Sequence, residues 1–85
     1  MTLDELRDEN PEALLADGLE DAFIGVGRRC GQPTVAVYCV AKAVGVLTRR
    51  DNMSTEEALE FLEFNSVGAW AGENTPIWFY GKVGL

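Results

Sequence analysis

Hydrophobic and polar residues follow two different repeats along the chain. One repeat predicts β-strands and the other predicts α-helices. Two β-rich runs, AFIGVGRRC and TVAVYCV, flank the turn residues Gly31-Gln32-Pro33, which predicts a β-hairpin over residues 22–40. Apolar residues then recur at helical spacing over residues 41–50 and 54–69. A run of large apolar residues predicts a last strand at 75–80.

Local signals mark where the helices begin. Ser54 is followed three residues later by Glu57, which is a capping-box pattern, and Thr2 with Glu5 forms the same pattern near the N-terminus. The motif Asn10-Pro11-Glu12 predicts a second short helix, because proline is favoured in a first helical turn. Isolated helices this short are marginal in water, so we expect residues 1–16 to be a mobile helical arm.

The predicted order is helix, strand, strand, helix, helix, strand. This order indicates an α+β fold, with a small three-stranded antiparallel sheet made of the hairpin 22–40 and the strand 75–80. The helices 41–50 and 54–69 are expected on one face of the sheet. The chain is interpreted as a single domain, residues 1–85. Its parts are the arm 1–16, a core at 17–80 and a tail at 81–85.

The last strand predicts an exposed apolar surface. Side chains alternate between the two faces of a strand, so Trp78 and Tyr80 share one face, while Ile77 and Phe79 share the other. Helices cover only one face of such a sheet, so one of these pairs is exposed. Exposed aromatic residues of this size favour a partner surface or a homodimer, with simple core packing as the alternative.

Charge narrows the classes of ligand. The 85 residues include 14 acidic and 7 basic side chains and no histidine, for a net charge of −7. The positive charge is concentrated in residues 22–52, between two acidic segments. Binding to nucleic acid or to an anionic membrane depends on lysine and arginine, so neither is expected. This distribution of charge indicates one of two arrangements. Either the charged segments are solvated and partly neutralise one another in the folded chain, or the basic residues form a pocket for a small anion.

The residue types also narrow the chemistry. The lack of histidine removes the usual general acid/base and nucleophile pairs, and two cysteines do not make a structural zinc site. We therefore expect a non-enzymatic protein with no metal and no cofactor. In the predicted hairpin Cys30 and Cys39 lie too far apart for a disulfide, so both thiols are expected to be free.

Several polar and aromatic residues are candidates for binding a ligand or a partner. Arg28 and Arg29 point to opposite faces of a strand, and one of them either pairs with an acidic residue or recognises an anion. Asn65 falls on the predicted buried face of its helix and is either a structural amide or a ligand contact. Tyr38 and Trp70 complete the candidate ligand site. The acidic partners considered for the buried arginine are Asp17, Glu20, Asp21 and Glu63.

One segment resembles a known group of proteins. The stretch Glu-Phe-Asn-x-x-Gly-Ala-Trp-x-Gly-Glu-x-Thr-Pro, residues 63–76, is similar to a family of small uncharacterised bacteriophage proteins. The similarity extends over about residues 17–79, although Cys39-Val40-Ala41 lacks an acidic residue that relatives carry there. The resemblance implies a phage gene product that acts in the host cytoplasm, and the Ala/Val/Gly/Arg composition points to an actinobacterial host.

These observations lead to one functional expectation and three alternatives. The expectation is a phage protein that binds a host protein for host takeover or counter-defence. The first alternative is a protein that sequesters a small anionic ligand such as a nucleotide signal. The other two are an acidic mimic of DNA and a metal-dependent enzyme.

Overall fold

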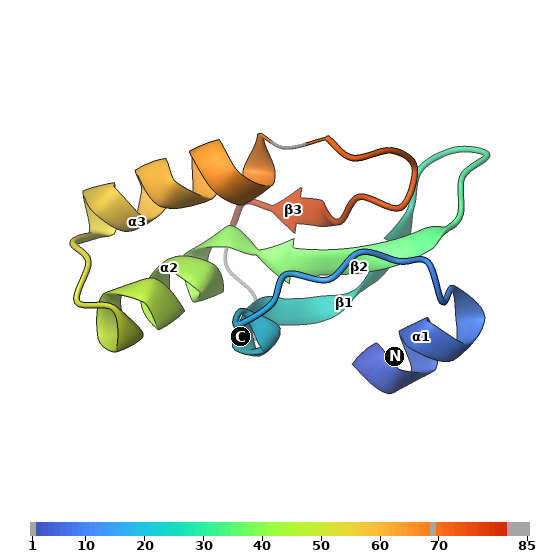
Figure 1. Cartoon of the computed structure of the whole chain (residues 1–85), viewed down its shortest axis with the longest axis horizontal. Coiled ribbons are helices and arrows are strands. Elements are labelled where there is room, and N and C mark those ends of the chain that lie inside the picture. The colour runs from blue at the N-terminus through green and yellow to red at the C-terminus, as the bar shows by residue number, and fades with distance from the viewer. Residues whose placement is uncertain (1, 69, 82–85) are drawn as a thin grey trace.

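The computed structural model describes residues 2–68 and 70–81, which form an α+β structure around an open sheet (Figure 1). In chain order the elements are α1 (Leu3–Glu9), the 3₁₀ turn η1 (Glu20–Ala22), β1 (Phe23–Arg28), β2 (Thr34–Cys39), α2 (Val40–Arg50), α3 (Thr55–Leu62), the π-helical turn η2 (Glu63–Val67) and β3 (Ile77–Phe79). The α+β class and the hairpin are therefore confirmed. None of the described helices combines the length and the apolar composition that spanning a membrane requires.

Both predicted capping boxes are present. The Thr2 hydroxyl accepts the Glu5 N–H at 3.2 Å, and the Glu5 carboxylate accepts the Thr2 N–H at 2.8 Å. Ser54 and Glu57 exchange the same two bonds at 3.1 and 3.0 Å. Because each carboxylate accepts a backbone N–H, the pKa of Glu5 and the pKa of Glu57 are lowered.

The predicted helix at Asn10-Pro11-Glu12 is wrong. After α1 the chain makes a turn and continues without regular structure to η1. The Asn10 amide donates to the Thr34 carbonyl at 2.8 Å and to the Asn74 side-chain oxygen at 2.9 Å. The Leu14 N–H donates to the Asn74 carbonyl at 3.1 Å. Bonds to distant segments thus replace the local bonds that a helix would need.

The sheet is mixed, and the prediction of a purely antiparallel sheet is wrong for its last strand. The strand order is β1-β2-β3, with β1 antiparallel and β3 parallel to β2. Trp78 pairs with Tyr38, and Phe79 pairs with Cys39. Figure 1 shows the cause, since α2 leads away from the sheet and α3 returns, so the chain enters β3 from the same end as β2. A crossover of this length is what parallel pairing requires.

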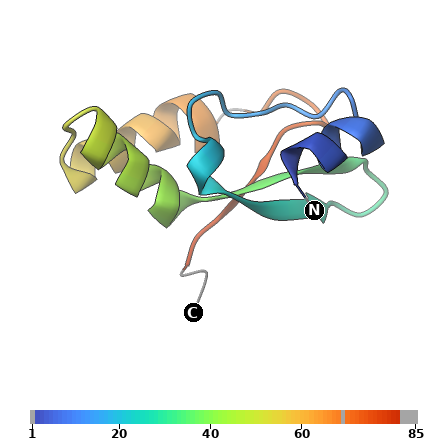
Figure 2. The same cartoon turned by 90° about the horizontal axis from the view of Figure 1, so that it is seen from below.

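The helices also differ from their predicted position on one face of the sheet. Cys39 ends β2 and Val40 begins α2, so the helix continues past the end of the strand. Helix α3 packs against α2 there (Figure 1). The sheet face that carries Ala36 and Tyr38 is covered by the N-terminal segment, whose Leu6 is fully buried (Figure 2). The core consists of Leu6, Leu19, Ala22, Ala36, Tyr38, Val40, Ala43, Val46, Leu47, Ala58 and Leu62.

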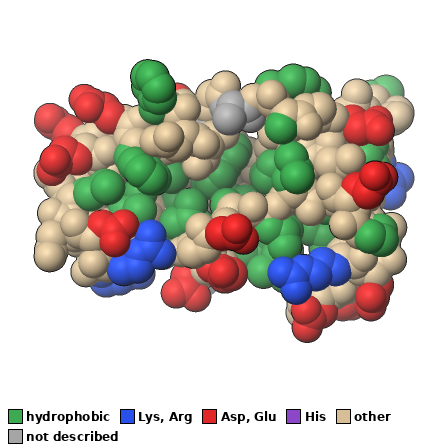
Figure 3. Space-filling view, in the orientation of Figure 1, with side chains coloured by type: hydrophobic (Ala, Val, Ile, Leu, Met, Phe, Trp, Pro, Cys, Tyr) green, Lys and Arg blue, Asp and Glu red, His purple; other side chains and the backbone are tan. Residues whose placement is uncertain are grey.

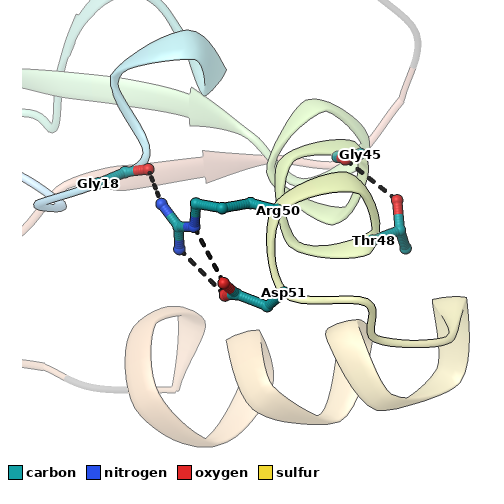
Figure 4. Close-up of polar contacts among 5 residues, drawn as sticks. All are labelled: Gly18, Gly45, Thr48, Arg50 and Asp51. Carbon is teal, nitrogen blue, oxygen red and sulfur yellow. Dashed lines mark hydrogen bonds and ion pairs between the residues drawn. The ribbon is translucent and has the colours of Figure 1, made fainter.

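The last turn of α2 is tied to the N-terminal segment through Arg50. Its guanidinium donates to the Gly18 carbonyl at 2.8 Å and to both carboxylate oxygens of Asp51 at 3.2 Å (Figure 4). Gly18 adopts φ +82°, a conformation that favours glycine. The carboxylate raises the pKa of Arg50. In the same helix the Thr48 hydroxyl donates to the Gly45 carbonyl at 3.0 Å.

The second face of the sheet, opposite the one that the N-terminal segment covers, is partly buried, because Val35 and Cys39 on it are fully buried. Ile77 and Phe79 belong to this face, whereas Trp78 lies on the covered face with Tyr38. Phe79 is 39% exposed and Tyr80 is 58% exposed, whereas Ile77 and Trp78 are half-buried, so one member of each predicted pair is exposed and neither pair is exposed as a whole. Both cysteines are free thiols, Cys30 exposed and Cys39 buried, which agrees with the hairpin prediction.

Candidate functional site

The turn between β1 and β2 places Arg29 beside the segment that leads into β3. The Gln32 N–H donates to the Arg29 carbonyl at 2.9 Å, and Gly31 has φ +73°, so the turn is closed by a glycine in the left-handed region. The Arg29 guanidinium donates to the carbonyl of Thr75 at 3.1 Å and to the carbonyl of Pro76 at 3.4 Å. These bonds hold the side chain against the opposite loop.

Trp70 lies against the same guanidinium. The central carbon of the Arg29 side chain is 4.9 Å from the centroid of the Trp70 ring, which is a cation–π geometry. The Thr75 hydroxyl accepts the Ala71 N–H at 2.8 Å and donates to the Gly72 carbonyl at 2.7 Å. These two bonds close the loop between Ala71 and Thr75, so the Thr75 carbonyl that accepts from Arg29 is held in place.

Arg29 and Trp70 line a pocket of about 370 Å³, which we call the Arg29 pocket. Its walls are mostly apolar, and Arg29 is the charged residue among them. The lining residues are Arg29, Gly68, Trp70, Thr75, Pro76, Ile77 and Trp78.

The acidic partner considered for Arg29 is not found. Among the described residues, the ion pair within salt-bridge distance is between Arg50 and Asp51, and no carboxylate lies at that distance from Arg29. Carbonyl oxygens and an indole ring take its place. Arg28 is exposed and donates to the Thr34 hydroxyl at 3.3 and 2.9 Å within its own hairpin. Of the two candidate arginines, Arg29 is the one that lines the pocket.

Tyr38 lies in the core and does not line the Arg29 pocket. Its side chain is fully buried, its hydroxyl accepts the Ala16 N–H at 2.9 Å, and its ring meets Phe23 edge-on at 6.0 Å. Burial raises the pKa of the Tyr38 hydroxyl. Trp78 stacks on the Tyr38 ring and also lines the pocket, so the pocket rests on the core.

Asn65 is exposed, so its predicted place on the buried helix face is wrong. Its amide donates to the Phe61 carbonyl at 3.0 Å. The buried positions of this region are Ala58 and Leu62. Phe61, one helical turn before Asn65, is also exposed, so this side of the helix faces solvent before the π-helical turn η2 begins. Ala69, the last residue of the predicted face, lies outside the described residues.

Tyr80 is exposed and contacts the helical region rather than the Arg29 pocket. Its hydroxyl donates to the Glu63 carboxylate, and this bond raises the pKa of Tyr80. Tyr80 also lines a second, more apolar hollow of about 310 Å³ with Leu59 and Val44. The contacts therefore bring the end of β3 against α3 and η2.

Sequence reasoning missed the most exposed aromatic residue. Phe64 is 88% exposed in η2 and was not among the candidates. Its signal was available in the sequence, since it lies next to Glu63 and four residues after Glu60, and charged neighbours indicate the solvent-facing side of a helix. Within the described ranges, no cluster of three or more Cys, Asp and Glu side chains has the arrangement of a metal site.

The structure thus brings together Arg29, Trp70 and Trp78, and it leaves Arg28, Tyr38, Asn65 and Tyr80 outside their pocket. Comparison with protein-family models, with curated proteins and with solved structures gives no match to this chain.

Proposed function

We propose that this chain is a phage-encoded, non-enzymatic protein that binds a host protein in the host cytoplasm. The observation that carries the proposal is a group of exposed large apolar side chains on α3, η2, the following loop and the end of β3. Its members are Leu59, Phe61, Phe64, Trp70, Phe79 and Tyr80, which we call the aromatic surface. The phage origin rests on the resemblance of residues 63–76.

The chemistry of these residues favours a protein partner. Phe64, Trp70 and Tyr80 are 88%, 63% and 58% exposed. Large exposed apolar groups are costly in water, and tryptophan and tyrosine dominate the binding energy of protein interfaces. Figure 3 displays hydrophobic side chains along the middle of one face, with charged side chains of both signs around them. A net charge of −7 opposes binding to nucleic acid.

Affinity capture from host lysate tests this proposal with two matched variants. Phe64→Ser removes the most exposed apolar side chain, so it should fold normally and lose the captured protein. Glu9→Ser changes an exposed residue in α1, at the opposite end of the molecule from α3, and should retain the captured protein (Figure 1). Capture of one protein by the wild type and Glu9→Ser only supports the proposal. Equal capture by all three proteins, or by none, contradicts it.

A second candidate is sequestration of a small anionic ligand such as a nucleotide. The observation that favours it is the Arg29 guanidinium, which lines a pocket without a carboxylate at salt-bridge distance among the described residues. A ligand at 100 times its dissociation constant stabilises a protein by about 2.7 kcal/mol. Thermal melting with a panel of nucleotides therefore tests it, and an unchanged melting temperature throughout the panel would exclude it.

A homodimer is a further proposal, carried by the exposed aromatic side chain of Phe79 at the end of β3. Native mass spectrometry of the purified chain distinguishes a dimer from a monomer. The same measurement detects a co-purified ligand as added mass.

A further inference from the structure

We propose that the Arg29 pocket binds one carboxylate group of the partner protein, from an acidic side chain or a C-terminus that lies beside an apolar side chain. This inference rests on the proposed function and names the chemistry by which the partner is recognised.

The guanidinium of Arg29 is held in place before any ligand arrives. It uses one N–H of each terminal nitrogen for the carbonyls of Thr75 and Pro76, and its face lies over Trp70. Arginine has five N–H donors, so three remain without a partner among the described residues. A fixed guanidinium loses little conformational entropy on binding, and its planar donors match a carboxylate.

The positive charge of Arg29 has no carboxylate at salt-bridge distance among the described residues, unlike the charge of Arg50. Arg50 is neutralised by Asp51, which lies at 3.2 Å. At Arg29 the neighbours are two carbonyl oxygens and an indole, which orient the cation without cancelling its charge. None of the residues that line the pocket is acidic. In an acidic protein this leaves a localised positive charge that an incoming anion can neutralise.

The walls of the pocket select among anions. One guanidinium balances one carboxylate, whereas a polyphosphate would need several cations. The remaining lining includes Trp70, Pro76, Ile77 and Trp78, which favours a ligand with an apolar group next to its charge. A volume of about 370 Å³ accommodates one apolar side chain and a carboxylate, but not a helix or a strand. The Arg29 pocket also shares Trp70 with the aromatic surface, so one partner can contact both.

Two small probes that differ only in charge test the inference on the unmodified protein. N-acetylphenylalanine carries a carboxylate beside an aromatic group, and N-acetylphenylalaninamide is its neutral counterpart. The readout is the pair of tryptophan indole N–H signals and the arginine Nε–H signals in nitrogen-15 NMR. We expect the acid to shift the signals of Trp70 and Arg29 saturably, with an affinity at least tenfold higher than that of the amide.

Two variants then assign the effect. Arg29→Gln removes the charge and should weaken binding of the acid at least tenfold, whereas Arg28→Gln, an exposed neighbour outside the pocket, should leave it unchanged. If Arg29→Gln does not fold, Arg29→Lys keeps the positive charge but loses the planar donors. It should bind the acid severalfold more weakly than the wild type.

Three results would overturn the inference. Equal binding of acid and amide would make the pocket an apolar contact only. Tighter binding of adenosine monophosphate than of the acid would assign the pocket to a phosphate ligand. Absence of any saturable shift would remove the site. Failure of the proposed function is seen separately, as wild-type protein that binds the acid but captures no host protein from lysate.

Discussion

The indole ring of Trp78 stacks on the phenol ring of Tyr38, with centroids 5.2 Å apart and planes inclined by 24°. Tyr38 belongs to the buried core, and Trp78 lines the Arg29 pocket. This contact is made between the paired strands β2 and β3, in the register that aligns the two residues. One wall of the candidate site therefore packs against the hydrophobic core.

Replacing Tyr38 by phenylalanine should destabilise the fold by about 1–2 kcal/mol. The ring contacts remain, but the Ala16 N–H loses the oxygen that accepts it at 2.9 Å and becomes an unpaired, partly buried donor. In a domain of this size the melting temperature should fall by roughly 4–8 °C for each kcal/mol. Differential scanning calorimetry measures the change. Tyr80→Phe is the control, since its exposed hydroxyl bonds to a surface carboxylate, and the melting temperature should hardly move. An equal loss in both variants would contradict the assignment.

Stability should decrease at alkaline pH because of Tyr38. Burial raises its pKa in the folded state above the value near 10 of an unfolded chain. The folded protein therefore holds the Tyr38 proton more tightly than the unfolded chain does. The stability that this difference contributes is complete below about pH 10 and is lost as the pH rises through the pKa of the folded state. Urea unfolding between about pH 8 and 11.5 should show a decline in the wild type and a clearly shallower decline in Tyr38→Phe. Tyr80→Phe should flatten the decline less, because the pKa of Tyr80 is also raised but its hydroxyl is exposed to solvent. The same slope in all three proteins would assign the decline to other groups.

Arg50→Gln should loosen the segment around Gly18. The variant loses the bond from the guanidinium to the Gly18 carbonyl at 2.8 Å, which joins α2 to the N-terminal segment. Hydrogen exchange followed by mass spectrometry should show faster exchange over residues 17–22. Asp51→Asn breaks the ion pair but leaves the Gly18 bond, so it should exchange like the wild type. Faster exchange in Asp51→Asn would mean that the ion pair, not the Gly18 bond, orders the segment.

Two glycine-to-alanine substitutions should change stability in opposite directions. A Cβ at Gly68 would lie 2.6 Å from the Glu63 carbonyl oxygen, which also accepts the Gly68 N–H at 3.0 Å. The backbone has to shift, so Gly68→Ala should cost about 1–3 kcal/mol. A Cβ at Gly45 would lie 3.1 Å from the flexible end of Arg49, and alanine in a helix interior is favoured over glycine by roughly 0.5–1 kcal/mol. Urea unfolding measures both, and a stabilising Gly68→Ala would contradict the close approach at η2.

The sequence predicted the elements better than their arrangement. The capping boxes of Thr2 and Ser54 and the hairpin around Gly31 depend on residues a few positions apart, and all three are present. The direction of β3 was predicted wrongly, because it depends on the end of the sheet to which the crossover through α2 and α3 returns the chain. The exposure of Asn65 was also predicted wrongly, because α3 buries only a narrow stripe that includes Ala58 and Leu62, and Phe61, one turn before Asn65, is already 41% exposed.

By itself, the sequence determined the α+β class, the two capped helix starts at Thr2 and Ser54, the turn that carries Arg29 and the excess of acidic charge, because short-range geometry and composition decide these properties. The tertiary structure decided which of the candidate residues meet. Arg29 donates to the carbonyl of Thr75, which is 46 positions away, and lies over the ring of Trp70. Tyr38, by contrast, is buried in the core. Such contacts depend on how the crossover through α2 and α3 returns the chain to the sheet, and local hydrophobic pattern does not encode that path.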